Sequence, residues 1–392
     1  MPNVPAPTTK AGRIPSRRSG GAWLTRRRVI PLMGLFATAA AARANEDTID
    51  MSHAVFVAIA GSHRVPFIDP DTDRIAGSID VGMVPDQVEL ASSISKLLAV
   101  DGRTPRINIV DLISGEVATE PLDFVPKRIT VAPGGLTAAL ADPKTGRLVL
   151  LDLLRRQTQG SVTGSAPLRD MLFSADGRTL YLSAGNGSAI AVIDTETARP
   201  ARSLETGLPP GTLALTRSPN GQRLFVQSNS GEVGVVDLEH RQPLSPIQAG
   251  ADSTVAFPSA SGAYWLIANN RRGTLTVIRD SSIPSTTVLP AASGVSVIYT
   301  AWFESLALVP SATMQALLVY DLDALKPAGF VRLAAAPGRG GITPDGRKLY
   351  LPLPDVRQIA VFDARQRQLV ASVSVPDIPA KVFLAGSYGV CH

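Results

Sequence analysis

Two small groups of side chains in this sequence could carry chemistry. The first group lies near both ends of the expected folded region, where His53 precedes it and Cys391 and His392 close the chain. A thiolate and two imidazoles form a ligand set that soft metal ions prefer. Cys391 is the only cysteine, and chain ends are commonly solvated, so an exposed tail is the alternative interpretation. We keep His53, Cys391 and His392 as a candidate metal site.

The second group is a set of cations that recur at one point of a repeated pattern. Five lysines and arginines occupy this point: Lys127, Arg128, Arg169, Arg339 and Lys381. Three acids share it, at Asp86, Asp170 and Asp252. An excess of positive charge that converges on one place would suit a small anionic molecule or a carboxylate-bearing cofactor. The alternative is that the cations are solvated or paired with the three acids.

Motifs for other chemistry are absent from the sequence. No pair of cysteines could attach haem, no zinc-ligand spacing occurs, and no phosphate-binding glycine loop or serine elbow is present. His63 and His240 stand in turn-like segments, where they are expected to be exposed. These absences favour a binding protein over an enzyme, and we expect no resident cofactor.

The elements that must position the cations come from an internal repeat. An aspartate closes a short apolar run eight times, at Asp69, Asp111, Asp152, Asp194, Asp237, Asp280, Asp321 and Asp363. Successive gaps are 42, 41, 42, 43, 43, 41 and 42 residues, and in the sixth copy Arg279 takes the aligned place, one residue before Asp280. A repeat of this length with several strands is typical of a β-propeller, in which each copy packs against its neighbours.

Residues 178–221 show one copy most clearly. Four strand-like runs alternate with turn signals, at 178–183, 189–194, around 202–204 and at 213–215. The turn Ser218-Pro219-Asn220-Gly221 leads into the next copy and has counterparts at 174–177 and 343–346. Four strands per copy predict an all-β, closed propeller of eight four-stranded blades.

The two ends of the repeat are expected to share one blade. The first copy begins at residues 54–57 without a leading strand, whereas the strand at 381–385 has no following copy to join. Pairing these two segments closes the ring and removes two open strand edges. Closure would also bring the tail after Ala385 toward the start of the first strand, near His53.

The repeat resembles a known family. The segments 180–183, 224–229, 265–269 and 349–351, each followed by a strand that ends in or next to an aspartate, resemble the YVTN-type repeats of YncE-like bacterial secreted proteins. The resemblance extends over residues 54–392 and implies the fold, while the same repeat serves binding proteins, cofactor-associated proteins and enzymes. Members often carry seven blades, so seven is the alternative to the eight counted here.

Residues 1–44 are expected to direct export rather than to join the fold. Residues 25–30, Thr-Arg-Arg-Arg-Val-Ile, resemble the twin-arginine signature, and an apolar stretch at 29–42 leads to the small-x-small cleavage site Ala42-Arg43-Ala44. This stretch is shorter than the roughly 20 residues that cross a bilayer, so no membrane span is expected after cleavage. Residues 45–53 would form a short lead, and residues 54–392 a single propeller domain.

Cleavage would reverse the sign of the net charge. The full chain holds 38 lysines and arginines and 33 acids, whereas residues 1–44 hold eight of these cations and no acid. The remaining chain therefore carries 30 minus 33, or −3. The basic character belongs to the leader, and it gives no support to nucleic-acid binding.

Two functions remain after these exclusions. We expect a periplasmic or secreted monomer that acts as a noncatalytic scaffold for a small anionic ligand or a periplasmic protein. The alternative is a redox-linked component associated with a quinone, haem or metal cofactor, because eight-bladed propellers include quinone-dependent alcohol dehydrogenases and modified-haem proteins of denitrification.

Overall fold

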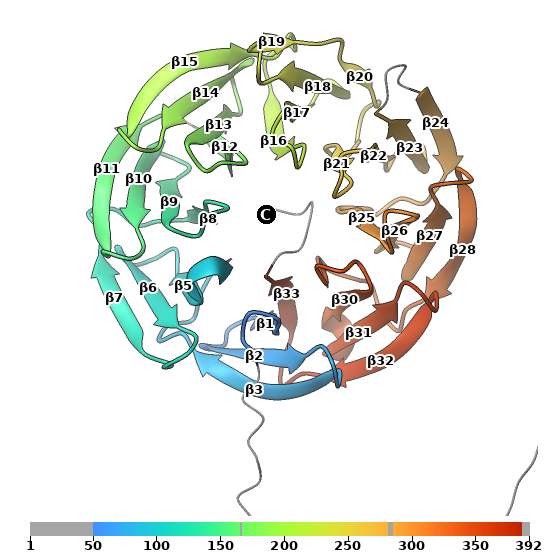
Figure 1. Ribbon diagram of the computed structural model, residues 1–392, viewed down its shortest axis with the longest axis horizontal. Coiled ribbons are helices and arrows are strands. Elements are labelled where there is room, and N and C mark those ends of the chain that lie inside the picture. The colour runs from blue at the N-terminus through green and yellow to red at the C-terminus, as the bar shows by residue number, and fades with distance from the viewer. Residues whose placement is uncertain (1–49, 165–166, 281–284, 386–392) are drawn as a thin grey trace, which may run out of the picture. The chain divides into compact units, whose positions relative to one another are not determined.

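Eight antiparallel sheets form a ring around a central channel. The computed structural model describes residues 50–164, 167–280 and 285–385, and Figure 1 shows the ring viewed along its axis. Each sheet is one blade with an inner strand at the channel, a second and a third strand, and an outer strand at the rim. The structure confirms the all-β propeller with eight blades and excludes the alternative of seven.

The strands occupy equivalent places in successive blades. The inner strands of blades 1 to 8 are β33 (Pro379–Leu384), β4 (Gln87–Ala91), β8 (Arg128–Val131), β12 (Leu168–Phe173), β16 (Thr212–Arg217), β21 (Phe257–Pro258), β25 (Tyr299–Ala301) and β29 (Gly341–Ile342). The second strands are β1 (Val55–Ile59), β5 (Lys96–Val100), β9 (Thr137–Asp142), β13 (Thr179–Ala184), β17 (Arg223–Ser228), β22 (Tyr264–Asn269), β26 (Leu306–Ser311) and β30 (Lys348–Leu353). The third strands are β2 (Arg64–Asp69), β6 (Arg106–Asp111), β10 (Arg147–Asp152), β14 (Ala189–Asp194), β18 (Glu232–Asp237), β23 (Thr274–Arg279), β27 (Ala316–Asp321) and β31 (Gln358–Asp363). The outer strands are β3 (Arg74–Asp80), β7 (Val117–Pro121), β11 (Gln157–Thr163), β15 (Arg199–Glu205), the pair β19 (Gln242–Pro243) and β20 (Ile247–Gln248), β24 (Ser285–Pro290), β28 (Lys326–Arg332) and β32 (Gln368–Ser374).

The core lies in the second and third strands. In β26 all six residues are buried, and in β10 the run from Leu148 to Leu151 is at most 3% exposed. Both faces of these strands are covered by neighbouring blades, which explains their nearly continuous apolar sequence. The outer strand β28 is exposed at almost every residue, so the rim contributes little to the core.

The recurring aspartates stabilise the turns between third and outer strands. Asp152 Oδ1 accepts hydrogen bonds from the backbone N–H groups of Leu154 and Arg155, at 2.9 and 2.8 Å. Asp237 makes the same contact with His240 N, at 3.1 Å. These donors lower the pKa of both carboxyl groups because they favour the charged form. The stabilisation is therefore present above the usual aspartate pKa of about 4 and is lost as the pH falls below it.

The last inner strand closes the ring. β33 pairs with β1 in an antiparallel ladder in which Val55 faces Leu384 and Phe56 faces Phe383. The rings of Phe56 and Phe383 stack with centroids 5.6 Å apart. This arrangement confirms the predicted sharing of one blade by the two ends of the repeat.

A second contact fastens the closing blades farther from the channel. Asp73, in the turn between β2 and β3 of blade 1, receives hydrogen bonds from Tyr350 and Lys348 of blade 8. The Tyr350 hydroxyl lies 2.6 Å from Asp73 Oδ1, and Lys348 Nζ lies 2.8 Å from Asp73 Oδ2 and 2.6 Å from the Pro70 carbonyl oxygen. The side chains of Asp73 and Lys348 are only 14% and 15% exposed. We call this group the closure clasp.

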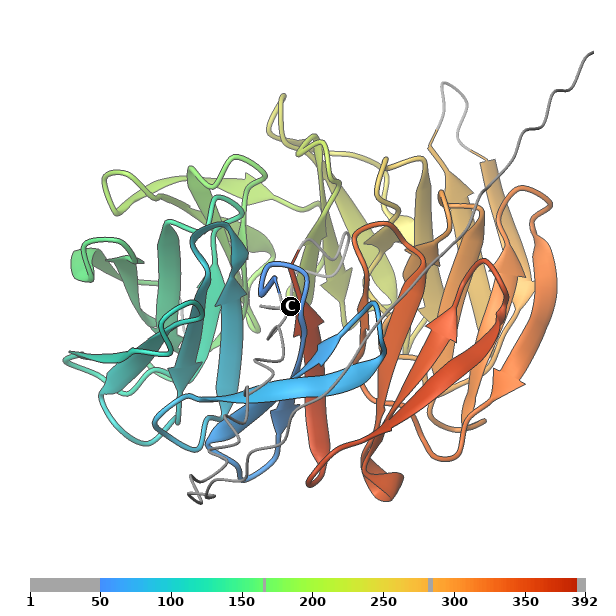
Figure 2. The same ribbon diagram turned by 60° about the horizontal axis from the view of Figure 1, so that its bottom comes forward.

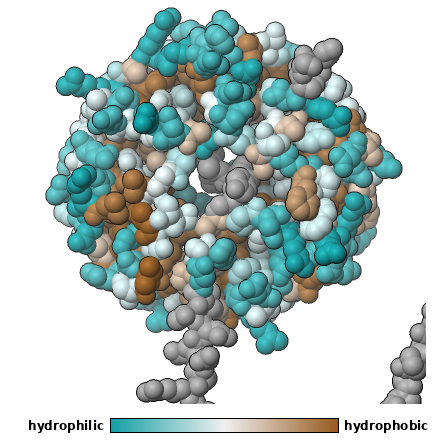
Figure 3. Space-filling view, viewed as in Figure 1, coloured by the Kyte–Doolittle hydropathy of each residue, from teal (hydrophilic) through white to brown (hydrophobic). Residues whose placement is uncertain are grey.

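The two faces of the ring carry different connections. Figure 2 shows β33 running toward the face that is seen in Figure 1, so that this face carries the turns from inner to second strands. The inner strands begin at the opposite face. Figure 3 shows the former face as largely hydrophilic, with hydrophobic residues gathered over blades 2 and 3, where Ile113, Leu136 and Leu154 are exposed.

Candidate functional site

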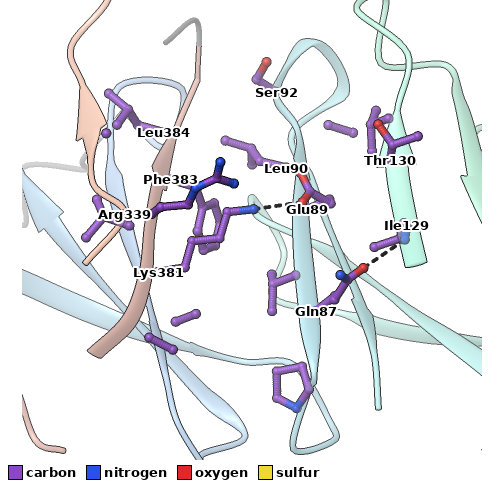
Figure 4. A pocket seen from close by; sticks show the side chains of 18 of the residues that line it. Gln87, Glu89, Leu90, Ser92, Ile129, Thr130, Arg339, Lys381, Phe383 and Leu384 are labelled. Carbon is purple, nitrogen blue, oxygen red and sulfur yellow. Dashed lines mark hydrogen bonds and ion pairs between the residues drawn. The ribbon is translucent and has the colours of Figure 1, made fainter. Parts of the chain in front are cut away.

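A cavity of about 590 Å³ lies in the central channel, mainly against blades 8, 1, 2 and 3, and Asp170 and Met171 of blade 4 and Tyr299 of blade 7 complete its wall. It extends from the starts of the inner strands, at Pro85 and Ala380, to the turns at their ends, at Ser92 and Gly135. Figure 4 shows its polar side chains on β33, β4 and the segment before β29. Sites for small molecules usually have volumes of 300–1,000 Å³, so this cavity has a suitable size.

One register position of the inner strands lies at the seam between neighbouring blades. Lys381, Gln87, Arg128 and Asp170 face Ala58, Val100, Ala141 and Ser183 across their ladders, and these partners are 42, 41 and 42 residues apart. Gln87 Oε1 accepts a hydrogen bond from Ile129 N in the next blade, at 3.0 Å. Asp170 Oδ2 does the same with Leu215 N, at 2.8 Å. An acceptor at this position therefore joins two inner strands.

Cations at this position cannot accept such a bond. Figure 4 shows that Lys381 and Arg339 both extend toward the space between β33 and β4. Lys381 Nζ lies 2.9 Å from Glu89 Oε1, and both side chains are partly buried. Arg128 is also partly buried and lines the cavity, and its guanidinium makes no hydrogen bond or ion pair with a residue that the structure describes. Arg128 can therefore donate to a bound anion.

Three acids, Asp86, Glu89 and Asp170, line the cavity together with the three cations, but none of them forms a described ion pair with Arg128. Asp170 is 9% exposed, and its two oxygens accept from Met171 N and Leu215 N. Glu89 is occupied by Lys381. Asp86 lies at the exposed start of β4. Because the oxygens of Asp170 and Glu89 are directed to other partners, the Arg128 guanidinium is the cation best placed to donate to a ligand.

The structure separates the five predicted cations into two sets. Arg128, Arg339 and Lys381 line the cavity, whereas Lys127 and Arg169 are exposed and are not among its lining residues. The Arg169 side chain folds over its own blade, since a Cβ atom on Gly185 would come within 2.5 Å of its Nε. Successive residues of a strand point to opposite sides, so Lys127 and Arg128 diverge. Asp252 is exposed and likewise lies away from the lining.

The candidate metal site is only partly within the described residues. His53 is exposed, and its Nδ1 lies 2.9 Å from Asp50 Oδ2. Cys391 and His392 lie outside the described residues, so the meeting of the three side chains stays a prediction. Within residues 50–164, 167–280 and 285–385, no group of three or more histidine, cysteine, aspartate or glutamate side chains could hold a metal ion.

Two lining residues were not singled out from the sequence. Glu89 lies in β4 and belongs to no motif in the sequence. Closure of the ring brings Lys381 next to it. Tyr299 is only 2% exposed. Its hydroxyl donates a hydrogen bond to the Gly340 carbonyl oxygen and accepts one from Gly340 N, both at 2.9 Å. Burial raises the Tyr299 pKa far above its usual range, so this phenol is a neutral, fixed part of the wall.

Comparisons with known proteins identify the fold but no family. No family model and no curated protein sequence matches the chain. Similar solved structures include dihydro-haem d1 dehydrogenase NirN in complex with DHE, with a TM-score of 0.71 and 15% identity over 86% of this chain and 76% of that one. Apo AztD from Citrobacter koseri has a TM-score of 0.63 and 15% identity, over 84% and 96% of the two chains. Hydrazine synthase from Kuenenia stuttgartiensis has a TM-score of 0.54 and 17% identity, over 71% and 95%.

In the part of the chain that the structure describes, no helix has the length and apolar character needed to cross a membrane.

Proposed function

We propose that this chain is an exported, noncatalytic β-propeller that binds a small anionic ligand in its channel. The observation that carries this proposal is the partly buried Arg128 guanidinium, which lines the cavity without a described ionic partner. Arg339 and Lys381 add positive charge from blades 8 and 1. A carboxylate or phosphate would receive charge-assisted hydrogen bonds from these donors in a partly enclosed space, where such bonds are strongest.

The binding test compares one lining cation with one that lies away from the cavity. Arg128→Ala is expected to weaken binding of an anion by roughly ten-fold or more, since a hydrogen bond to a charged group contributes about 1.5–3 kcal/mol. Arg169→Ala is the matched control, because Arg169 occupies a neighbouring inner strand but is exposed and outside the lining. Thermal-shift and calorimetric titrations with a panel of carboxylates and phosphates provide the measurement.

Salt should weaken the interaction, since screening acts on charged partners. If no anion stabilises the wild-type protein, or if Arg128→Ala and Arg169→Ala respond alike, the channel cations are only solvated charges.

A redox-linked role is the second candidate. The fold similarity to a haem-d1-related dehydrogenase in complex with DHE favours it, and a tetrapyrrole carboxylate would be an anion of the proposed class. The described histidines, His53, His63 and His240, are not among the lining residues of the channel cavity. An absorption spectrum of protein purified from the periplasm separates the candidates, because a bound chromophore would support the redox role.

Export by the twin-arginine route forms part of the proposal. Replacing both Arg26 and Arg27 by lysine is expected to hold the precursor in the cytoplasm, because a guanidinium pair is not interchangeable with two ammonium groups. Cell fractionation followed by intact-mass measurement checks both the location and cleavage after Ala44. Normal periplasmic accumulation of the double variant would indicate the general secretory route.

A further inference from the structure

The turn between β25 and β26 departs from the pattern of the other blades. In five of the equivalent turns a glycine adopts positive φ: Gly135, Gly177, Gly221, Gly262 and Gly346. Blade 7 instead places Trp302, Phe303 and Glu304 in the left-handed region, with φ of 47°, 56° and 62°. Three successive side chains in this region are strained, because the Cβ atom crowds the backbone there.

Neighbouring blades hold this turn in place. The Glu304 carboxylate accepts hydrogen bonds from Ser259 Oγ at 3.0 Å and Ser261 Oγ at 2.6 Å, and also from Ser261 N, all in blade 6. On the other side, Trp302 N donates to the Gly346 carbonyl oxygen of blade 8 at 2.9 Å. In Figure 1 the hairpins of blades 6 and 8 lie on either side of β25 and β26. The strained turn is therefore a fixed part of the surface.

The turn exposes aromatic surface beside a second cavity. Phe303 is 85% exposed, and its ring meets that of Trp302 at 65° with centroids 5.1 Å apart. The adjacent depression has a volume of about 530 Å³, and its wall includes Ile342 and Pro344. A highly exposed phenylalanine ring beside a half-buried tryptophan, both at a depression, is typical of a recognition surface rather than of a core.

The charges at this depression are negative. Among its described lining residues are two carboxylates, Glu304 and Asp345, and no lysine, arginine or histidine. Neither carboxylate forms an ion pair with a described residue, since their hydrogen bonds come from Ser259, Ser261, the Thr343 hydroxyl and Arg347 N. Such bonds leave the negative charge in place, so the site attracts cations and repels anions.

A cation already uses one of the aromatic faces. The guanidinium carbon of Arg365, from blade 8, lies 5.7 Å from the centre of the Trp302 ring. This contact shows that the local geometry supports a cation–π interaction. The Phe303 ring is left largely to solvent and lines the depression together with Trp302 and the two carboxylates.

We propose that this depression binds a small organic ammonium cation. The apolar groups of the ligand contact Phe303 and Trp302, while Asp345 and Glu304 balance its charge. The site lies on the face of the ring opposite to the starts of the inner strands, and it is independent of the proposed anion site in the channel. The strain at Phe303 is retained because glycine, which would relieve it, offers no aromatic face.

Tryptophan fluorescence tests the proposal, because in residues 45–392 the tryptophans are Trp302 and the buried Trp265. Choline is the probe, and 3,3-dimethylbutan-1-ol is its neutral isostere of nearly the same shape. Choline is expected to change the Trp302 emission with saturation, and the isostere to bind about ten-fold more weakly or not at all. Asp345→Asn should reduce choline affinity about three-fold to ten-fold, because it removes one of the two negative charges that attract the cation. Equal binding of the isostere, or no saturable response to choline, would overturn the proposal.

The variant Phe303→Gly distinguishes the effect of the aromatic ring on choline affinity from its effect on stability. Glycine accepts positive φ without strain, so this variant is expected to melt at a higher temperature than the wild type and yet to lose at least five-fold in choline affinity. Phe330→Leu is the matched control, since Phe330 is also exposed, at 52%, but lies on the outer strand β28. Unchanged choline affinity in Phe303→Gly would show that the aromatic ring is not part of a cation site.

Discussion

Removal of residues 379–392 is expected to open the ring and to lower the melting temperature strongly. The deletion takes away β33, which pairs with β1 along its whole length and buries Val382, Phe383 and Leu384. Burial of such side chains contributes about 1.5–3 kcal/mol each, so these three alone account for roughly 4.5–9 kcal/mol. For a chain of this size the loss corresponds to a fall in Tm of roughly 6–13 °C.

A shorter deletion provides the control. Removing residues 386–392 leaves every residue of β33 in place, so the melting temperature is expected to change by less than about 2 °C. Differential scanning calorimetry of both truncations measures the difference. If the longer truncation melts like the wild type, the contacts of β33 do not hold the ring closed.

The fold could be predicted because the repeat leaves its mark on every blade. An aspartate that caps the turn after the third strand must stand where N–H groups are left without partners, so Asp152 and Asp237 recur at nearly constant spacing. In the sixth copy the aspartate stands one residue late, at Asp280. The only difference in the strand is that β23 ends at Arg279 instead of at an aspartate. The split outer strand of blade 5 was not predictable in this way, because outer strands have few buried side chains that fix their register.

The channel could be predicted only in part. The repeat predicts that Arg128 and Arg339 lie at inner strands. It does not indicate whether Lys127 or Arg128 faces the channel, because a shift of one residue moves a side chain to the opposite side of the strand. The contact between Lys381 and Glu89 joins residues 292 positions apart and depends on closure of the ring.

The turn at Trp302 could not be predicted from turn-forming residues, because it contains no glycine, proline, asparagine or aspartate. The absence of these residues is itself a signal in the sequence. The tetrapeptide Trp302-Phe303-Glu304-Ser305 occupies the turn in which five other blades have a glycine with positive φ. Such a departure from a repeat indicates either backbone strain that the fold tolerates or a surface that takes part in binding.

Asp73→Ala is expected to have the second largest effect, because it breaks the closure clasp. Without this carboxylate, the mostly buried Lys348 keeps only the Pro70 carbonyl as a partner, and the Tyr350 hydroxyl loses its acceptor. Breaking a buried ion pair from one side costs about 3–5 kcal/mol. Asp73 also has φ of 54°, which asparagine tolerates better than alanine, so Asp73→Asn should recover part of the loss.

The matched control is an ion pair at the surface. Arg155 is 77% exposed, and its pair with Asp152 measures 2.8 Å, so Arg155→Ala should cost less than about 1 kcal/mol. Denaturant unfolding of both variants gives the comparison. Equal losses would show that the clasp behaves as a surface pair.

The clasp also predicts how stability depends on alkaline pH. Burial, and then the hydrogen bond to Asp73, raise the Tyr350 pKa far above its usual range. A raised pKa in the folded state means that the stabilisation is complete below the unfolded tyrosine pKa of about 10 and is lost as the pH rises above it. Tyr350→Phe removes this ionisation, so its free energy of unfolding should fall less between pH 9 and 11 than that of the wild type. A parallel decline in both proteins would mean that Tyr350 does not couple ring closure to pH.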